Sequence, residues 1–206
     1  MDRFPLIPLR RLAAVCLACL AALTAATGQT LLDSLPEREL PLLRAELRRA
    51  LAERWLGGQH PALIQNDLAG TCILDSLSDT YLRLYPTGAD KIEVRRLPGG
   101  LRLLIHTVTQ PALDSRLTVY DAAWRPTASG LAEPRLEDFY VPCDTVPMDV
   151  FRAYAVPYVP AYRLEGDSLV ATYSPRPYVP DEHWQRIEPA LRRGPIYIPL
   201  PTAQRP

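Results

Sequence analysis

The fold is decided by residues 71–121, which read TCILDSLSDTYLRLYPTGADKIEVRRLPGGLRLLIHTVTQPALDSRLTVYD. Apolar and polar residues alternate here with a period of about two, which is typical of β-strands. The connections between the runs are short, as at Pro98-Gly99-Gly100 and Gln110-Pro111-Ala112. Because parallel neighbours need a crossover of a dozen residues or more, these runs are expected to form an antiparallel meander. The expected strands span residues 71–77, 80–85, 91–97, 101–109 and 116–121.

An amphipathic helix on the N-terminal side supplies a cover for this sheet. Ser34-Leu35-Pro36-Glu37 fits a capping box and predicts a helix start, and Pro41 predicts a break before the helix continues. Over residues 41–56 apolar side chains recur at spacings of three and four, until Gly57-Gly58 ends the pattern. The apolar stripe comprises Leu43, Leu47, Ala50, Leu51 and Trp55, and the polar face comprises Arg44, Glu46, Arg48, Arg49 and Glu53.

The last third of the chain is rich in proline and tyrosine. Residues 156–162 read VPYVPAY and predict an extended strap whose tyrosine rings lie on the sheet with their hydroxyls outward. The alternative is a proline-rich ligand for an aromatic groove. A second strand pair follows at 162–165 and 168–173, joined by a Gly166-Asp167 turn. A helix over 181–193, bent at Pro189, and a short strand at 196–198 complete the chain.

These elements together predict an α+β fold. An antiparallel β-meander sheet is covered by the N-terminal amphipathic helix and is followed by the second strand pair and the C-terminal helix. Along the strand at 101–109, one set of side chains alternates with another, and the two sets are Leu101, Leu103 and Ile105 on one face and Arg102, Leu104 and His106 on the other. This alternation predicts one buried face and one mixed, exposed face.

Residues 1–28 have the form of a secretory signal peptide. Arginines precede an apolar run of about fifteen residues, and Ala26-Thr27-Gly28 places small residues at a cleavage site. The run is shorter than the roughly twenty residues of a membrane-spanning helix, so cleavage after Gly28 is favoured over an uncleaved anchor. A periplasmic or secreted protein with no membrane span after cleavage is expected.

Residues 29–206 are then expected to form a single α+β domain. The stretches 114–120 and 167–173 resemble each other faintly. An alternative organisation is therefore two related halves, 29–133 and 134–206.

Charge and cysteine content restrict the classes of partner and of cross-link. Lys plus Arg and Asp plus Glu both number 23, so the neutral chain offers no basic footprint for nucleic acid. After signal cleavage only Cys72 and Cys143 remain, in an oxidising compartment where a disulfide can form. Sequence spacing does not give the distance between them. A bridge and a pair of buried free thiols therefore both stay open.

One tetrapeptide matches a catalytic signature. Gly166-Asp167-Ser168-Leu169 spells the motif of a class of serine esterases, in which the serine leads into a helix and later residues supply oxyanion donors and a base. Here Leu169 begins a predicted strand, and the only asparagine, Asn66, precedes the motif. We interpret the tetrapeptide as a turn followed by a strand start.

No other residue pattern predicts a catalytic, cofactor or metal site. His60, His106 and His183 lack the spacing of metal ligands. Glu137-Asp138 is a pair of adjacent residues, which on a strand face opposite ways, and Asp181-Glu182 suits a helix N-terminus. We therefore expect no catalytic residue, no cofactor and no metal.

A series of short motifs resembles a known family. The motifs are Leu35-Pro36, Leu42-Leu43, Asn66-Asp67-Leu68-Ala69-Gly70, Leu77-Ser78-Asp79-Thr80-Tyr81-Leu82, Leu97-Pro98, Asp114-Ser115-Arg116-Leu117-Thr118-Val119-Tyr120-Asp121 and Trp124-Arg125-Pro126. With them the chain resembles, over roughly residues 33–198, the Bacteroidales family catalogued as domain of unknown function 3256. The resemblance implies an exported envelope protein of mixed α and β structure with no assigned activity.

Two functional hypotheses follow. The first is a non-catalytic periplasmic binding or assembly module whose partner is an envelope protein or glycan, because the sheet is expected to expose a mixed face. The second is a hydrolase of envelope glycans or esters, which rests on the expected export, on Ser168 and on the unassigned carboxylates. A pocket that gathers two carboxylates, or Ser168 with His183, would favour the hydrolase.

Overall fold

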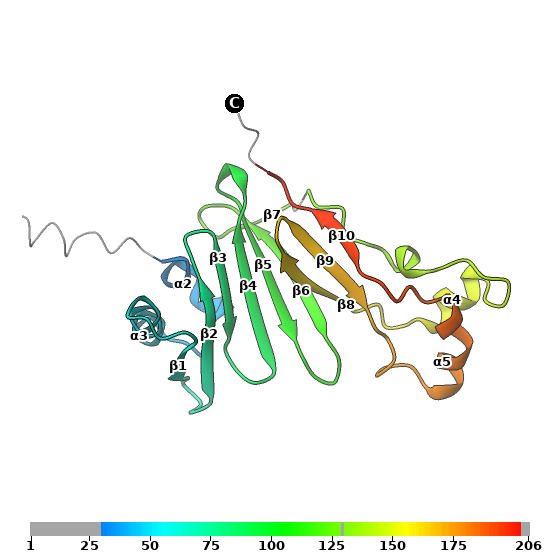
Figure 1. Cartoon of the computed structure of the whole chain (residues 1–206), viewed down its shortest axis with the longest axis horizontal. Helices are drawn as coiled ribbons and strands as arrows, with labels where there is room; N and C mark the ends of the chain where they lie inside the picture. The colour runs from blue at the N-terminus through cyan, green and yellow to red at the C-terminus, as the bar shows by residue number, and fades with distance from the viewer. Residues whose placement is uncertain (1–29, 129, 203–206) are drawn as a thin grey trace, which may run out of the picture. The chain divides into compact units, whose positions relative to one another are not determined.

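Two antiparallel sheets, one of seven strands and one of three, carry the fold within residues 30–128 and 130–202, which the computed structural model describes (Figure 1). The predicted signal peptide, residues 1–28, lies outside the described residues. The seven strands follow one another in the sheet in chain order, so the predicted meander is confirmed. They are β1 Ala62–Gln65, β2 Thr71–Leu77, β3 Tyr81–Tyr85, β4 Asp90–Arg96, β5 Arg102–Val108, β6 Asp114–Tyr120 and β7 Pro126–Thr127.

Side chains of the large sheet are buried on both faces. Leu103 and Ile105 belong to one apolar core, and Leu104 between them belongs to the other. The expectation that the face opposite Leu103 and Ile105 is exposed around β5 is therefore wrong. That face is covered by the N-terminal helical segment, and the Leu103 face is covered by the three-stranded sheet.

The N-terminal segment forms three short helices instead of one interrupted helix. They are α2 Leu31–Ser34, the 3₁₀ helix η1 Glu37–Glu39 and α3 Ala45–Leu56. The predicted capping box is wrong, because Ser34 ends α2 and its Oγ donates to the carbonyl of Leu31 at 2.8 Å. The predicted helix up to residue 56 is confirmed from Ala45 onward.

Arg48 departs from the polar face assigned to it. It is buried within α3, and its guanidinium donates to the backbone carbonyl of Leu35. The segment 31–43 folds over this side of α3. The Leu35 carbonyl, just after α2, therefore accepts from Arg48, although the helical period predicts that this side chain faces solvent.

The small sheet packs on the large one through a shared apolar core. Its strands are β8 Pro160–Glu165, β9 Ser168–Tyr173 and β10 Ile196–Pro199, in the order β10-β9-β8. The predicted hairpin around Gly166-Asp167 is confirmed, with Glu165 opposite Ser168. Leu169 and Ala171 of β9 share the core of Leu103 and Ile105.

The expectation of outward tyrosine hydroxyls is wrong. Tyr162 is buried, and Tyr158 donates its hydroxyl hydrogen to the carbonyl of Pro134. The hydroxyl of Tyr173 donates to the carbonyl of Ala155 at 2.6 Å. Phenols that bury their rings at this depth must place their hydroxyls on protein acceptors, since water is excluded.

Short helices connect the remaining strands. The predicted C-terminal helix begins at Asp181 as expected, but it ends at Ile187 as α5 and continues only as the 3₁₀ turn η4 Glu188–Ala190, which contains Pro189. Helix α4, Met148–Tyr154, was not expected from the sequence. Two further 3₁₀ turns are η2 Pro98–Gly100 and η3 Leu136–Phe139. Along residues 30–128 and 130–202, every helix is too short or too polar to cross a lipid bilayer.

Candidate functional site

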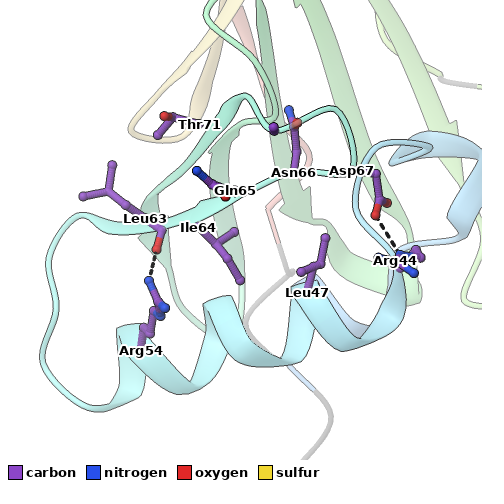
Figure 2. A pocket seen from close by; sticks show the side chains of 10 residues that line it. Arg44, Leu47, Arg54, Leu63, Ile64, Gln65, Asn66, Asp67 and Thr71 are labelled. Atoms are coloured by element: carbon purple, nitrogen blue, oxygen red, sulfur yellow. Dashed lines mark hydrogen bonds and ion pairs between the residues drawn. The ribbon is translucent and has the colours of Figure 1, made fainter.

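A groove of about 730 Å³ lies between α3 and the outermost strand, β1 (Figure 2). Helix α3 and its N-cap form one wall, β1 forms the floor, and the turn that follows β1 closes one end. The groove is therefore built by two elements close in sequence that pack at one end of the sheet. Its lining residues are Arg44, Leu47, Arg54, Leu63, Ile64, Gln65, Asn66, Asp67, Ala69 and Thr71.

The backbone of β1 has one edge paired with β2 and one edge open to the groove. The amide of Asn66 donates to the carbonyl of Gly70 at 2.8 Å, which makes this a hydrogen-bonded pair. Hydrogen-bonded and non-hydrogen-bonded pairs alternate along an antiparallel ladder, so Ile64 with Cys72 is the next bonded pair. Leu63 and Gln65 lie at the non-bonded positions, opposite Ile73 and Thr71. Their amide and carbonyl groups consequently point away from β2.

Arg54 of α3 occupies one of these outward groups. Its Nη1 donates to the backbone carbonyl of Leu63, as the dashed line in Figure 2 shows. This contact independently establishes that the Leu63 carbonyl faces the helix. Arg54 has no carboxylate within ion-pair distance among the described residues.

The turn from Asn66 to Gly70 is held rigidly at the closed end of the groove. Asn66 is buried, and its Oδ1 accepts from the amides of Leu68 at 3.0 Å and Gly70 at 2.9 Å. Asp67 is tied to the N-cap of α3, because its Oδ1 lies 2.7 Å from Nε of Arg44. The turn and the helix are thereby fixed to each other across the groove.

Two exposed leucines lie at the groove. Leu63 of β1 lines it and is 45% exposed, and Leu68, in the turn that closes one end, is 75% exposed. These two side chains add apolar surface at the margin of the groove.

The structure keeps the residues of the esterase-like motif apart from their potential partners. Ser168 opens β9 beside the Gly166-Asp167 turn and pairs with Glu165 and Pro199. His183 lies in α5, where its ring packs on Tyr154 with centroids 4.5 Å apart. Tyr173, at the opposite end of β9 from Ser168, is the residue that reaches the end of α4. The length of a strand thus separates Ser168 from the region of His183.

The other histidines and carboxylates are also dispersed. His60 packs edge-on against Trp55 with centroids 4.1 Å apart, and His106 of β5 lies 3.3 Å from Asp90. Glu137 and Asp138 lie in η3, not on a strand, and Asp181 and Glu182 open α5 as predicted. Across residues 30–128 and 130–202, no three His, Cys, Asp or Glu side chains are grouped so as to hold a metal ion.

Cys72 and Cys143 are free thiols in this structure and lie in different surroundings. Cys72 is buried in the core on the α3 side of the large sheet, and burial raises the pKa of its thiol to about 12. Cys143 packs at the edge of the other core, and hydrogen bonding to Thr145 lowers the pKa of its thiol.

A buried carboxylate lies on β4, outside the groove. Glu93 is fully buried; its Oε2 lies 2.8 Å from Nζ of Lys91, and its Oε1 accepts from the hydroxyl of Tyr81 at 2.8 Å. Nε of Arg83 lies 3.4 Å from the same oxygen. Burial, together with the carboxylate of Glu93, raises the pKa of Tyr81. The negative charge is thus compensated locally, as expected for a structural ion cluster.

Sequence reasoning missed the groove because it missed β1. Asn66-Asp67-Leu68-Ala69-Gly70 entered the sequence analysis only as a motif of the family resemblance, and the four residues before it, 62–65, are too few to show a period. The signal that was present is a turn with apolar residues on both sides, which is typical of a hairpin.

Comparison with known proteins adds a fold and a family. No curated protein matches the chain. A solved structure, a domain of an uncharacterized protein from Porphyromonas gingivalis W83, matches with a TM-score of 0.69 and 24% sequence identity over 82% of this chain and 92% of that chain. At this identity the likeness shows a shared fold. A family model described as a protein of unknown function, DUF3256, matches residues 20–198, and the chain therefore belongs to the DUF3256 family.

Proposed function

We propose that the protein is an exported, non-catalytic binding module of the cell envelope and that the groove between α3 and β1 is its binding face. Export rests on the signal-peptide pattern of residues 1–28. The observation that carries the binding role is the open edge of β1, whose outward backbone groups at Leu63 and Gln65 lie inside a walled groove.

The groove is built to hold a ligand in place. Its turn is fixed by Asn66, and the ion pair between Arg44 and Asp67 fixes the helix to the turn. A pre-formed concave surface loses little conformational entropy when a partner binds. The exposed side chains of Leu63 and Leu68 add apolar area at its margin.

The lining chemistry favours binding over bond cleavage. Most glycoside hydrolases use a pair of carboxylates, and serine esterases use a nucleophile with a base. Among the described lining residues, the one carboxylate is Asp67, which is already paired with Arg44. The other polar groups are hydrogen-bond donors and acceptors, together with the guanidinium of Arg54, which bonds to the neutral carbonyl of Leu63 and to no carboxylate among the described residues.

Site-specific photo-crosslinking in cells that make the protein tests this proposal. A photoreactive phenylalanine analogue replaces Leu68 beside the groove or, as the control, Tyr197 on β10, which is also well exposed. We expect one discrete adduct from position 68, none from position 197, and loss of the adduct when Arg54→Gln is added. Equal adducts at both positions, or none at either, would contradict the proposal. Mass spectrometry of the mature protein tests export separately and should give Gln29 as the first residue.

A further inference from the structure

We infer that the groove binds an extended peptide segment, which adds as a further strand to the outer edge of β1 and places a carboxylate on Arg54. This inference rests on the proposed binding role and names the class of ligand. Strand addition uses main-chain hydrogen bonds for affinity and alternate side chains for specificity.

The hydrogen-bonding groups on the open edge of β1 match an added strand. Leu63 presents an amide donor and a carbonyl acceptor away from β2, and Gln65 presents the same pair two residues later. An extended peptide places its own donors and acceptors at this two-residue spacing, on a strand about 4.8 Å away. The four residues of β1 suit a segment of similar length.

Arg54 now bonds to the acceptor that such a peptide would need. Its guanidinium bonds to the Leu63 carbonyl, a neutral acceptor, and no described carboxylate pairs with it. A carboxylate in the groove would offer Arg54 a stronger, charge-assisted partner. The Leu63 carbonyl would then be free to accept the amide of the incoming strand. The ion pair between the peptide carboxylate and Arg54 and the main-chain hydrogen bonds to β1 therefore form together.

Alternation along the peptide fixes where the acidic residue lies. Successive side chains of a strand point to opposite faces, so one set faces α3 and the other faces away. The wall on the α3 side presents Leu47 between Arg44 and Arg54. A peptide with an acidic residue on this face, and β-branched residues two positions before and two positions after it, complements the wall in charge and in apolar surface.

The groove suits a peptide better than a sugar. Protein sites for sugars gain much of their affinity from aromatic rings that stack on the sugar face, and the described lining has no aromatic residue. A main-chain edge, a guanidinium and a leucine are the features that peptide-binding grooves use.

Nuclear magnetic resonance titration of the full chain tests the inference with a defined probe. The probe is the capped peptide acetyl-Val-Thr-Glu-Thr-Val-amide, which places its two valines and its one carboxylate on the same face. Its matched control has the same side chains but is N-methylated at the amides that would face β1. We expect the probe to shift the amide resonances of Leu63 and Gln65 and to slow their exchange with solvent. The methylated peptide should do neither, because it cannot complete the ladder.

Two protein variants separate the charge contribution from the ladder. Arg54→Gln should weaken probe binding about fivefold, the range of an exposed ion pair, whereas Arg49→Gln on the exposed side of α3 should leave it unchanged. Gln65→Pro removes one outward amide at an edge position where proline is tolerated. In this variant the probe should no longer slow the exchange of the Leu63 amide.

The other possible results distinguish failure of the peptide inference from failure of the proposed binding role. Shifts that persist with the methylated peptide, or that map outside the groove, would overturn strand addition. If chitobiose shifts the groove amides and the peptide does not, the groove binds and only the peptide inference fails. If the amide resonances of Leu63 and Gln65 shift with protein concentration and not with the probe, the groove binds a second copy of the chain, and the peptide inference fails. If neither probe nor protein concentration affects the groove, the inference fails, and persistent crosslinks from position 68 would show that the binding role itself survives.

Discussion

The side-chain amide of Asn66 joins two loops of the large sheet, because its Nδ2 donates to the backbone carbonyl of Pro86 at 2.9 Å. Its Oδ1 accepts two backbone amides within its own turn. Replacement by alanine removes all three hydrogen bonds at a buried position. We expect Asn66→Ala to lower the free energy of unfolding by about 3 kcal/mol, measured by urea denaturation. The exposed neighbour is the control, and Gln65→Ala should change stability by less than about 0.5 kcal/mol.

A pair of glycine substitutions tests the same turn without replacing Asn66. A Cβ on Gly70 would lie 3.2 Å from Nδ2 and 3.3 Å from Oδ1 of Asn66, whereas a Cβ on Gly88 would meet no atom within 4 Å. Gly70→Ala should therefore destabilise the protein, and Gly88→Ala should be neutral or slightly stabilising. Equal effects would show that the contact between Gly70 and the Asn66 amide does not constrain the turn.

The buried ion cluster on β4 predicts a large effect of removing one charge. Glu93→Gln leaves Lys91 without its carboxylate in a partly buried position, and we expect a loss of about 3 kcal/mol in unfolding free energy. The exposed pair between Glu165 and Arg163 provides the control. Glu165→Gln should cost no more than about 0.5 kcal/mol. A Glu93→Gln protein as stable as the parent would contradict a structural role for the cluster.

The tyrosine-rich core predicts loss of stability at high pH. Burial raises the pKa of Tyr162 from 10.0 to about 12, and burial also raises the pKa of Tyr158 and Tyr173. The unfolded chain therefore releases these protons at lower pH than the folded chain does. The stabilisation is complete below pH 10 and is lost as the pH rises through the folded-state pKa values. Chemical denaturation as a function of pH, with tyrosinate absorbance, measures this, and Tyr162→Phe should reduce the slope. A flat profile above pH 10 would contradict it.

The two cysteines should differ in reactivity. Cys143 is partly exposed and has a lowered thiol pKa, whereas Cys72 is buried and has a raised one, so a thiol reagent should modify Cys143 first. Cys72 should react only after unfolding. Peptide mapping by mass spectrometry identifies the modified residue. Failure of both to react in unfolded, unreduced protein would show instead that they are bridged.

The sequence predicted the elements whose patterns are long enough to be periodic. The period of two over residues 71–121 predicted β2 to β6, because strands of five to seven residues alternate visibly. Helix α3 was predicted from its apolar stripe, although Arg48 was assigned to the wrong face. Arg48 is buried because the segment that contains Leu35 folds back on α3 and presents a backbone carbonyl to the guanidinium. The helical period of α3 carries no information about this contact.

The candidate site could not be predicted from the sequence for a different reason. Residues 66–70 have the composition of a turn, but the edge of β1 is open because β1 is an outermost strand of the sheet. That is a property of the whole topology and not of residues 62–65. The contact of Arg54 with the Leu63 carbonyl likewise requires α3 to lie beside that edge. Sequence patterns identify faces of elements, whereas this site is formed by an edge.

Amide hydrogen exchange of β1 tests the central claim most directly. In the free protein, Ile64 should be protected by its bond to Cys72, whereas Leu63 and Gln65 should exchange rapidly because their amides face the groove. Addition of the acidic peptide should slow Leu63 and Gln65 and leave Ile64 unchanged. Protection of all three amides in the free protein would show that the outer edge of β1 is already covered, and it would contradict the account.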